Sequence, residues 1–181
     1  MNIQHSSATN EWYTPASVMG LVREVLGPLD LDPASCARAN QTVQATTYLD
    51  QTYDALANKW PAARTVFLNP PGGRKGKRSN AILFWERLLQ YRVEEPTFEH
   101  AIFVAFSIEF LQTSQSSSMP AMALPLCVPR QRIRFDSPSM TEQSPSHSNA
   151  LIYVQGRTNA SERFAEVFRN LGYVLVPSRF I

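Results

Sequence analysis

The sequence predicts an α/β fold with a mostly parallel central sheet and helices on both faces. Three observations lead to this prediction. Short apolar runs that suit buried strands alternate along the chain with amphipathic helical patterns. The run 101–106 is continuously apolar, which is typical of a parallel strand covered on both faces. Polar residues stand at the carboxyl ends of two of the expected strands, where sheets of this kind bind their ligands.

The first helix is expected to start at Thr14 and Pro15, with Thr14 as the N-cap and Pro15 at the first helical position. Apolar residues then recur at helical spacing until Gly27, which predicts the end of the helix. A strand is expected at 29–32. An irregular segment at 37–60 follows, with a short helix at 55–60. The next strand, 65–68, leads directly into Asn69.

The remaining elements follow from the same periodicities. Helices are expected at 80–91, 108–115 and 164–171, the last capped by Gly172, and strands at 101–106, 121–127, 150–154 and 173–176. Two loops interrupt the pattern. The loop 72–79 contains glycines and basic residues, and the polar segment 129–148 is long enough to predict a functional loop.

Composition is that of an ordinary globular protein. The chain has 181 residues, of which 44% are hydrophobic and 18% are charged, so one domain at 11–181 after a flexible tail at 1–10 is expected. The sequence shows neither an apolar run of membrane-spanning length nor a signal-peptide pattern, so a cytoplasmic protein is expected. Cys36 and Cys127 are too far apart for a metal motif. We expect free thiols and no metal.

Basic residues are unevenly distributed on a chain whose formal net charge is only +2. One cluster occupies the Gly-containing loop and another recurs at every second position; they are Arg74, Lys75, Lys77 and Arg78, and Arg130, Arg132 and Arg134. On an extended segment, the second cluster would project to one face, with Gln131, Ile133 and Phe135 on the other. Such clusters fit a nucleic-acid groove, but they also fit solvated surface segments, and charge alone does not decide.

The segment Asn69-Pro70-Pro71 ends a strand in a stiff conformation, because Pro70 forces Asn69 to be extended and both prolines have a fixed φ. Two acceptors, the Asn69 side-chain oxygen and the Pro70 carbonyl, are then held close together. A planar exocyclic amine with two hydrogens is a suitable ligand for such a pair. Taken alone, however, Asn-Pro is also a common turn signal.

Five segments in order resemble the phage-type Dam-like DNA N6-adenine methyltransferases. They are Glu11-Trp12-Tyr13-Thr14-Pro15, Leu29-Asp30-Leu31-Asp32-Pro33-Ala34-Ser35, Asn69-Pro70-Pro71, Pro129-Arg130-Gln131-Arg132-Ile133-Arg134-Phe135 and Pro145-Ser146-His147-Ser148-Asn149-Ala150. The resemblance implies a three-layer, Rossmann-type methyltransferase fold and S-adenosylmethionine as the cofactor. It also implies DNA as the partner and methyl transfer to the exocyclic N6 of adenine, in a protein of phage or mobile-element origin linked to restriction and modification.

The resemblance also implies roles for individual residues. Asn69 and Pro70, with Pro71, would form the catalytic motif and accept the amine hydrogens of a base flipped out of the duplex. The cofactor would contact Trp12, Tyr13, Thr14, Pro15, Asp32, Ala34, Ser35 and Asp54, and DNA would contact the two basic clusters and His147. Structural alternatives stay open: an aromatic staple on the first helix for Trp12 and Tyr13, a turn for Asp32, a helix N-cap for Asp54, a solvated edge strand for the arginines and a turn cap for His147.

The sequence departs from the family pattern after the prolines. Most relatives have an aromatic residue there to stack on the base, whereas this chain has Gly72-Gly73. Phe84, Trp85 and Phe106 are candidate replacements. Two other functions stay open: a DNA-binding, anti-restriction type of relative without turnover, and an amino-methyltransferase acting on cytosine N4 or RNA. A monomer and a homodimer are both compatible with the sequence.

Overall fold

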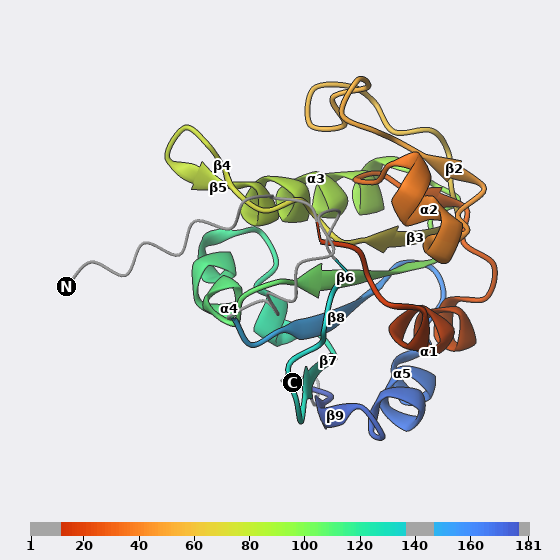
Figure 1. Cartoon of the computed structure of the whole chain (residues 1–181), viewed down its shortest axis with the longest axis vertical. Helices are drawn as coiled ribbons and strands as arrows, with labels where there is room; N and C mark the ends of the chain where they lie inside the picture. The colour runs from red at the N-terminus through yellow and green to blue at the C-terminus, as the bar shows by residue number, and fades with distance from the viewer. Residues whose placement is uncertain (1–11, 137–146, 178–181) are drawn as a thin grey trace.

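The computed structural model describes residues 12–136 and 147–177, and Figure 1 shows their arrangement. A seven-stranded sheet has the order β2-β1-β3-β6-β8-β7-β9. Its strands are β1 (Leu31–Asp32), β2 (Thr47–Tyr48), β3 (Thr65–Leu68), β6 (His100–Ala105), β7 (Leu126–Pro129), β8 (Ala150–Gln155) and β9 (Gly172–Leu175). A separate hairpin consists of β4 (Arg74–Lys75) and β5 (Arg78–Ser79).

The helices are α1 (Ala16–Leu26), α2 (Ala37–Val43), α3 (Asn80–Glu94), α4 (Glu109–Thr113) and α5 (Ser161–Phe168), with 3₁₀ turns η1 (Ser114–Ser116) and η2 (Ala121–Ala123). No helix in the described ranges is long and apolar enough to cross a membrane. The expected tail at 1–10 lies outside the described residues.

The sheet is mostly parallel, as the sequence predicts. Strands β2, β1, β3 and β6 pair in parallel, and β8 is antiparallel to both β6 and β7. Strand β7 therefore runs with the parallel set, while β8 and β9 run against it. The apolar run that suits a parallel strand is β6, which has a parallel neighbour on one side and an antiparallel neighbour on the other.

Each face of the sheet has its own hydrophobic core, because alternate residues of a strand point to opposite faces. Val66 and Leu68 pack in one cluster with residues of α3 and α4, such as Trp85 and Phe110. Phe67 packs in the other cluster, which contains residues of α1 and α5. Figure 1 shows α3 apart from α1 and α5, with the sheet between them. The three-layer arrangement expected from the sequence is thereby confirmed.

The chain changes direction across the sheet between β1 and β3. From β1 it passes through α2 to β2 on one side, and it then returns to β3 on the other side of β1. In open α/β sheets this reversal leaves a crevice at the carboxyl ends of the two strands, where ligands bind. Asp32 ends β1 and Asn69 directly follows β3. The topology therefore places these two residues beside the crevice.

Helix α1 differs from the prediction at its start. It begins at Ala16 with Pro15 as the N-cap, and no side chain caps it, so the prediction of Thr14 as the cap is wrong. The predicted end at Gly27 is confirmed, since Gly27 has a φ of 73° that favours glycine. The hydroxyl of Thr14 instead accepts a hydrogen bond from the Asn69 side chain.

The segment 37–60 is more ordered at its start than the sequence suggests. The sequence did not predict helix α2. Its N-cap is Cys36, whose thiol accepts a hydrogen bond from the Ala39 backbone N–H at 3.5 Å. A thiol is not a typical capping group, so the sequence carries no clear start signal for this helix. The helix expected at 55–60 is absent from this described segment. The Trp60 indole instead donates to the Ala55 carbonyl at 2.7 Å and closes a turn.

Other boundaries differ as well: β1 starts at Leu31, α3 ends at Glu94, and α5 spans Ser161–Phe168 instead of 164–171. The basic loop contains the β4–β5 hairpin, whose turn uses Gly76 at a φ of 64°. The strand expected at 121–127 starts only at Leu126, after a 3₁₀ turn. Gly172 is the first residue of β9 rather than the cap of the preceding helix.

Candidate active site

A cavity of about 470 Å³ lies at the carboxyl ends of β1 and β3. Residues from the three segments predicted to bind the cofactor and the base line it, together with Asp54: Trp12, Tyr13, Thr14, Asp32, Ala34, Ser35, Asn69 and Pro71. Pro70 is buried beside it, and Pro15 lies in a different groove. The structure thus brings most of the predicted site residues together around one space, while their individual roles stay predictions.

Asn69 is held by the N-terminal segment through its side-chain amide. The Nδ2 group donates to the Trp12 carbonyl oxygen at 2.8 Å and to the Thr14 hydroxyl oxygen at 3.1 Å. A flipped amide would place its oxygen against the Trp12 carbonyl, and two acceptors repel each other. The amide orientation is therefore fixed by these contacts.

The other end of the same amide has no partner. The Asn69 Oδ1 atom is buried, with less than 1 Å² accessible, and accepts no hydrogen bond. A buried unpaired acceptor is costly, and its presence at a cavity wall indicates a missing donor. Among residues 12–136 and 147–177, no hydrogen bond ends on the Pro70 carbonyl oxygen either. Within the described residues, neither proposed amine acceptor has a hydrogen-bond partner.

The turn after the two prolines is held by Asn80, the first residue of α3. Its side-chain Nδ2 donates to the Gly72 carbonyl at 2.9 Å, and its backbone N–H donates to the Gly73 carbonyl at 3.0 Å. Asn80 also lines the cavity. The sequence analysis missed this residue. Its position directly after Ser79, which caps α3, was the available signal.

Asp32 is the most deeply buried acid in the cavity, with 2% of its surface exposed. Burial raises its pKa from 3.8 to about 7, although the Ala34 backbone N–H donates to its carboxylate at 3.2 Å. Asp50, which also lines the cavity, has a lowered pKa because the Thr52 hydroxyl and backbone hydrogen-bond to it. The Asp50 carboxylate, together with that of Asp54, makes the lining favourable for a cationic ligand.

Asp54 joins the cavity to the hairpin. Its carboxylate lies 3.6 Å from the Lys75 Nζ on β4, and both residues line the cavity. Asp54 sits in a turn with a φ of 44° rather than at the start of a helix, so the N-cap alternative is wrong. The hairpin therefore contributes to the wall of the cavity.

The two aromatic residues of the N-terminal segment differ in their surroundings. The Arg38 guanidinium lies over the Tyr13 ring, 5.5 Å from the ring centroid, so one face of the Tyr13 ring already contacts a cation. Trp12 packs against the core beneath α1 and also lines the cavity. Trp12 can therefore pack as a hydrophobic staple on the first helix and line the cavity at the same time.

A cluster of rings continues from Trp12. The Phe106 ring centroid lies 6.0 Å from that of Trp12, 5.4 Å from that of Phe135 and 6.4 Å from that of His147. Asn149 holds the cluster together: it donates to the Phe106 carbonyl at 2.8 Å and accepts from the Ile133 backbone at 3.2 Å. The sequence analysis gave Asn149 no role, although it belongs to one of the segments that resemble the family.

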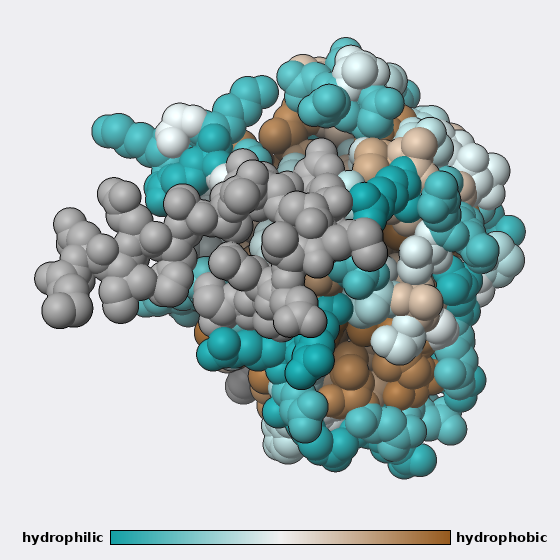
Figure 2. All heavy atoms as spheres, viewed as in Figure 1, coloured by the Kyte–Doolittle hydropathy of each residue, from teal (hydrophilic) through white to brown (hydrophobic). Residues whose placement is uncertain are grey.

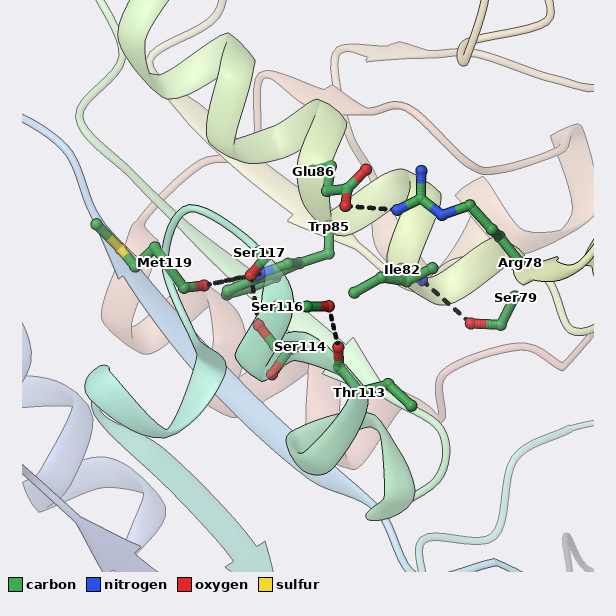
Figure 3. Close-up of polar contacts among 10 residues, drawn as sticks. All are labelled: Arg78, Ser79, Ile82, Trp85, Glu86, Thr113, Ser114, Ser116, Ser117 and Met119. Atoms are coloured by element: carbon green, nitrogen blue, oxygen red, sulfur yellow. Dashed lines mark hydrogen bonds and ion pairs between the residues drawn. The ribbon is translucent and has the colours of Figure 1, made fainter.

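Trp85 is excluded as a partner for a base. Figure 3 shows its indole pointing toward Ser117 and Met119; Nε1 donates to the Met119 carbonyl at 3.0 Å and to the Ser117 hydroxyl at 3.2 Å. The side chain is fully buried, so this candidate was wrong. Phe84 lines the cavity, and Phe106 is half-buried in the ring cluster.

The basic residues of the hairpin are mostly engaged. The Arg74 guanidinium donates to the Lys77 carbonyl, Lys75 pairs with Asp54, and Arg78 pairs with Glu86 at 2.5 Å (Figure 3). Lys77 has no side-chain partner in the part of the chain that the structure describes. The hairpin therefore offers fewer free charges than the sequence suggests.

The arginine row follows β7 and belongs to no strand. Arg130, Arg132 and Arg134 are exposed, as expected, while Ile133 and Phe135 are buried. Gln131 is also exposed, unlike Ile133 and Phe135, with which it was expected to share a face.

The row lines a second groove of about 560 Å³, together with Pro15, Val18 and Leu171. Figure 2 shows an apolar hollow with a hydrophilic border in the region of α1, β7 and α5. Arg130 donates to the Asn170 carbonyl at 3.1 Å. Within the described residues, Arg132 and Arg134 have no ion-pair partner.

The raised pKa of Asp32 predicts a dependence of stability on pH. The folded state keeps a proton on Asp32 that the unfolded chain releases above pH 3.8, so this contribution is full below pH 3.8 and is lost as the pH rises through about 7. We expect Asp32→Asn to increase the free energy of unfolding at pH 8, by something on the order of a few kcal/mol, and to have little effect near pH 4. Denaturant unfolding of the cofactor-free protein at both pH values measures the difference.

Asp50→Asn is the matched control in the same cavity. Asp50 has a lowered pKa, so its replacement brings no gain in stability at pH 8. A difference between Asp32→Asn and the wild type that does not change with pH would contradict the assignment of a buried, protonated Asp32.

This chain resembles known proteins both in sequence and in fold. A family model described as DNA N-6-adenine-methyltransferase (Dam) matches residues 3–163. No curated protein sequence matches significantly. A structure from Listeria monocytogenes, described as a class I S-adenosylmethionine-dependent methyltransferase, has a TM-score of 0.50 and 12% identity over 87% of this chain. A dimethyladenosine transferase from Plasmodium falciparum has a TM-score of 0.47 and 9% identity, covering 87% of this chain and 70% of that chain.

This chain spans 64% of the length of the Listeria protein. That similarity supports the expected methyltransferase-like fold, and the family match extends over most of the chain. The chain therefore belongs to the DNA N-6-adenine-methyltransferase (Dam) family.

Proposed function

We propose that this protein methylates the exocyclic N6 of adenine in DNA. The observation that carries the proposal is the unpaired, buried Oδ1 of Asn69, a residue that lines the cavity and precedes Pro70, whose carbonyl no described residue uses. Resemblance to phage-type members supports a phage or mobile-element origin and a role in protecting that DNA from restriction.

The two acceptors suit an amine because each takes one hydrogen of the –NH₂ group. Hydrogen bonds to both hydrogens draw the nitrogen away from planarity and leave its lone pair free to attack a methyl group. After attack, the nitrogen loses one proton to water. Neither acceptor titrates, so the contribution of Asn69 and Pro70 is orientation and electrostatic stabilisation.

The cavity fits the cofactor in size and charge. Its volume of about 470 Å³ is within the range of small-molecule sites, roughly 300–1,000 Å³. S-adenosylmethionine supplies a methyl group on a sulfonium, which is a good leaving group. We propose that the acids Asp32 and Asp54 and the aromatic faces of Trp12 and Tyr13 hold this cationic molecule, with Ala34 and Ser35 completing the wall. Thr14 belongs to the same wall.

A flipped base needs a stacking face, and Gly72 provides none. Phe106 is the best candidate among the described aromatic residues. It is half-buried rather than fully buried, and its ring contacts Trp12, whose carbonyl holds Asn69. His147 lies on the outer side of the same cluster and is exposed, which supports a DNA contact for it.

The DNA backbone would contact the arginine row and the tip of the hairpin. Arg132 and Arg134 are exposed and unpaired within the described chain, and Lys77 is the corresponding free cation on the hairpin. Phosphates bind such groups without regard to base sequence. Arg74, Lys75 and Arg78 would contribute after exchanging their present partners.

The first test is incubation with tritiated S-adenosylmethionine and unmethylated DNA, followed by digestion to nucleosides. We expect label in N6-methyladenine. Asn69→Ala removes the side-chain acceptor, so we expect turnover to fall by at least roughly a hundredfold while calorimetry shows cofactor affinity near that of the wild type. Asn159→Ala, an exposed asparagine that hydrogen-bonds to Ser161 at the start of α5, is the matched control.

Label in cytosine would support the N4-amine alternative instead. Binding of cofactor and DNA without incorporation would support the relative that lacks turnover. Full activity of Asn69→Ala would rule out the amine-acceptor role.

The arginine row predicts a salt-dependent contribution to DNA binding. Each phosphate contact that is lost reduces the slope of log K against log salt by about one. We therefore expect Arg132→Ala and Arg134→Ala each to reduce the slope by about one, and Arg157→Ala to leave it unchanged. Arg157 is an exposed arginine that follows β8, at the end of the sheet away from Asn69. Equal slopes for all these proteins would remove the row from the interface.

A further inference from the structure

The hydroxyl of Thr14 links the N-terminal segment to the side-chain amide of Asn69, the proposed acceptor. Thr14 is 3% exposed and lines the cavity. The sequence suggests a helix cap, yet no side chain caps α1. Its Oγ1 instead accepts from the Asn69 Nδ2 at 3.1 Å, across 55 positions of sequence.

Thr14 and the Trp12 carbonyl together use both N–H donors of the Asn69 amide. Two contacts fix the plane of the amide, whereas one contact would leave it free to turn about the terminal torsion, which has only a broad preference of its own. The direction of Oδ1 follows from the same plane. Loss of the Thr14 hydroxyl therefore misdirects the acceptor without removing it.

The backbone that carries Thr14 is itself anchored. Tyr13 and Asp136 exchange backbone hydrogen bonds of 2.8 and 2.9 Å, so the segment that supplies both acceptors is tied to the chain that follows the arginine row. The hydroxyl therefore faces Asn69 from a fixed position. A flexible contact would not orient the amide in this way.

We infer that Thr14 is a positioning residue for methyl transfer, whose hydroxyl orients the Asn69 amide rather than binding the cofactor. This inference rests on the proposed function. It separates two roles within one segment: the aromatic side chains of Trp12 and Tyr13 face the cofactor, and the Thr14 hydroxyl serves the reacting amine.

The test compares kcat, KM for S-adenosylmethionine and calorimetric cofactor affinity in Thr14→Val, Thr14→Ala and Thr14→Ser. Val replaces the hydroxyl with a methyl group and keeps the shape, Ala removes both the hydroxyl and the γ-methyl group, and Ser keeps the hydroxyl without the γ-methyl group. We expect Val and Ala to lower kcat by at least roughly tenfold with cofactor affinity within about threefold of the wild type, and Ser to retain most of kcat.

Thr65→Val is the control for a purely structural effect. Thr65 is a buried threonine at the other end of β3; its hydroxyl donates to the Pro28 carbonyl at 2.7 Å and accepts from the Asp30 backbone. We expect this variant to lower the melting temperature and to leave kcat unchanged.

The outcomes separate the two proposals. A wild-type protein that transfers no methyl group to DNA adenine would refute the proposed function. An active wild type with unchanged kcat in both Thr14→Val and Thr14→Ala would refute only the positioning role. A cofactor affinity that falls in these variants while kcat is kept would make Thr14 a cofactor ligand and would also overturn the inference. So would failure of Thr14→Ser to restore kcat.

Discussion

The geometry of the site depends on how the Asn69 amide is held. Its nitrogen donates to the Trp12 carbonyl and to the Thr14 hydroxyl, and its oxygen remains buried and unpaired at the cavity wall. A protein normally pairs its buried polar atoms, because an unpaired acceptor costs roughly 1–3 kcal/mol. Here the two donor bonds prevent the amide from turning to relieve that cost, so the oxygen keeps the position from which, in the proposed function, it would accept from an incoming amine.

Several segments that are distant in sequence converge to maintain this arrangement. The switch in strand order between β1 and β3 opens the crevice that Asp32 and Asn69 border. The backbone of Tyr13 pairs with that of Asp136, in the segment that follows β7. Asn149 links this segment, at Ile133, to Phe106 at the end of β6. The N-terminal segment, the chain after β7 and the strand that delivers Asn69 are thus joined by hydrogen bonds into one frame. A groove lined by arginines lies on the outer side of that frame.

Patterns in the sequence predict the elements whose formation depends on neighbouring residues, such as the apolar strands of the sheet. Strands β3, β6 and β8 are apolar runs of four to six residues, and they were placed to within a residue or two. Helix α2 was missed because its cap is the thiol of Cys36. The roles of Thr14, Asn80 and Asn149 were missed because each depends on hydrogen bonds formed only in the folded chain. For Thr14, a strong local preference for capping gave way to such a tertiary contact.

The proposed function depends on where the amine of the substrate binds. The most direct measurement is a crystal structure of the protein with S-adenosylhomocysteine and an oligonucleotide containing its target adenine. We expect an extruded adenine whose N6 lies roughly 2.8–3.2 Å from both the Asn69 Oδ1 and the Pro70 carbonyl oxygen, with the Asn69 nitrogen still hydrogen-bonded to Trp12 and Thr14. An adenine amine outside hydrogen-bonding distance of both oxygens, or an Asn69 amide turned so that its nitrogen faces the base, would contradict the proposed function.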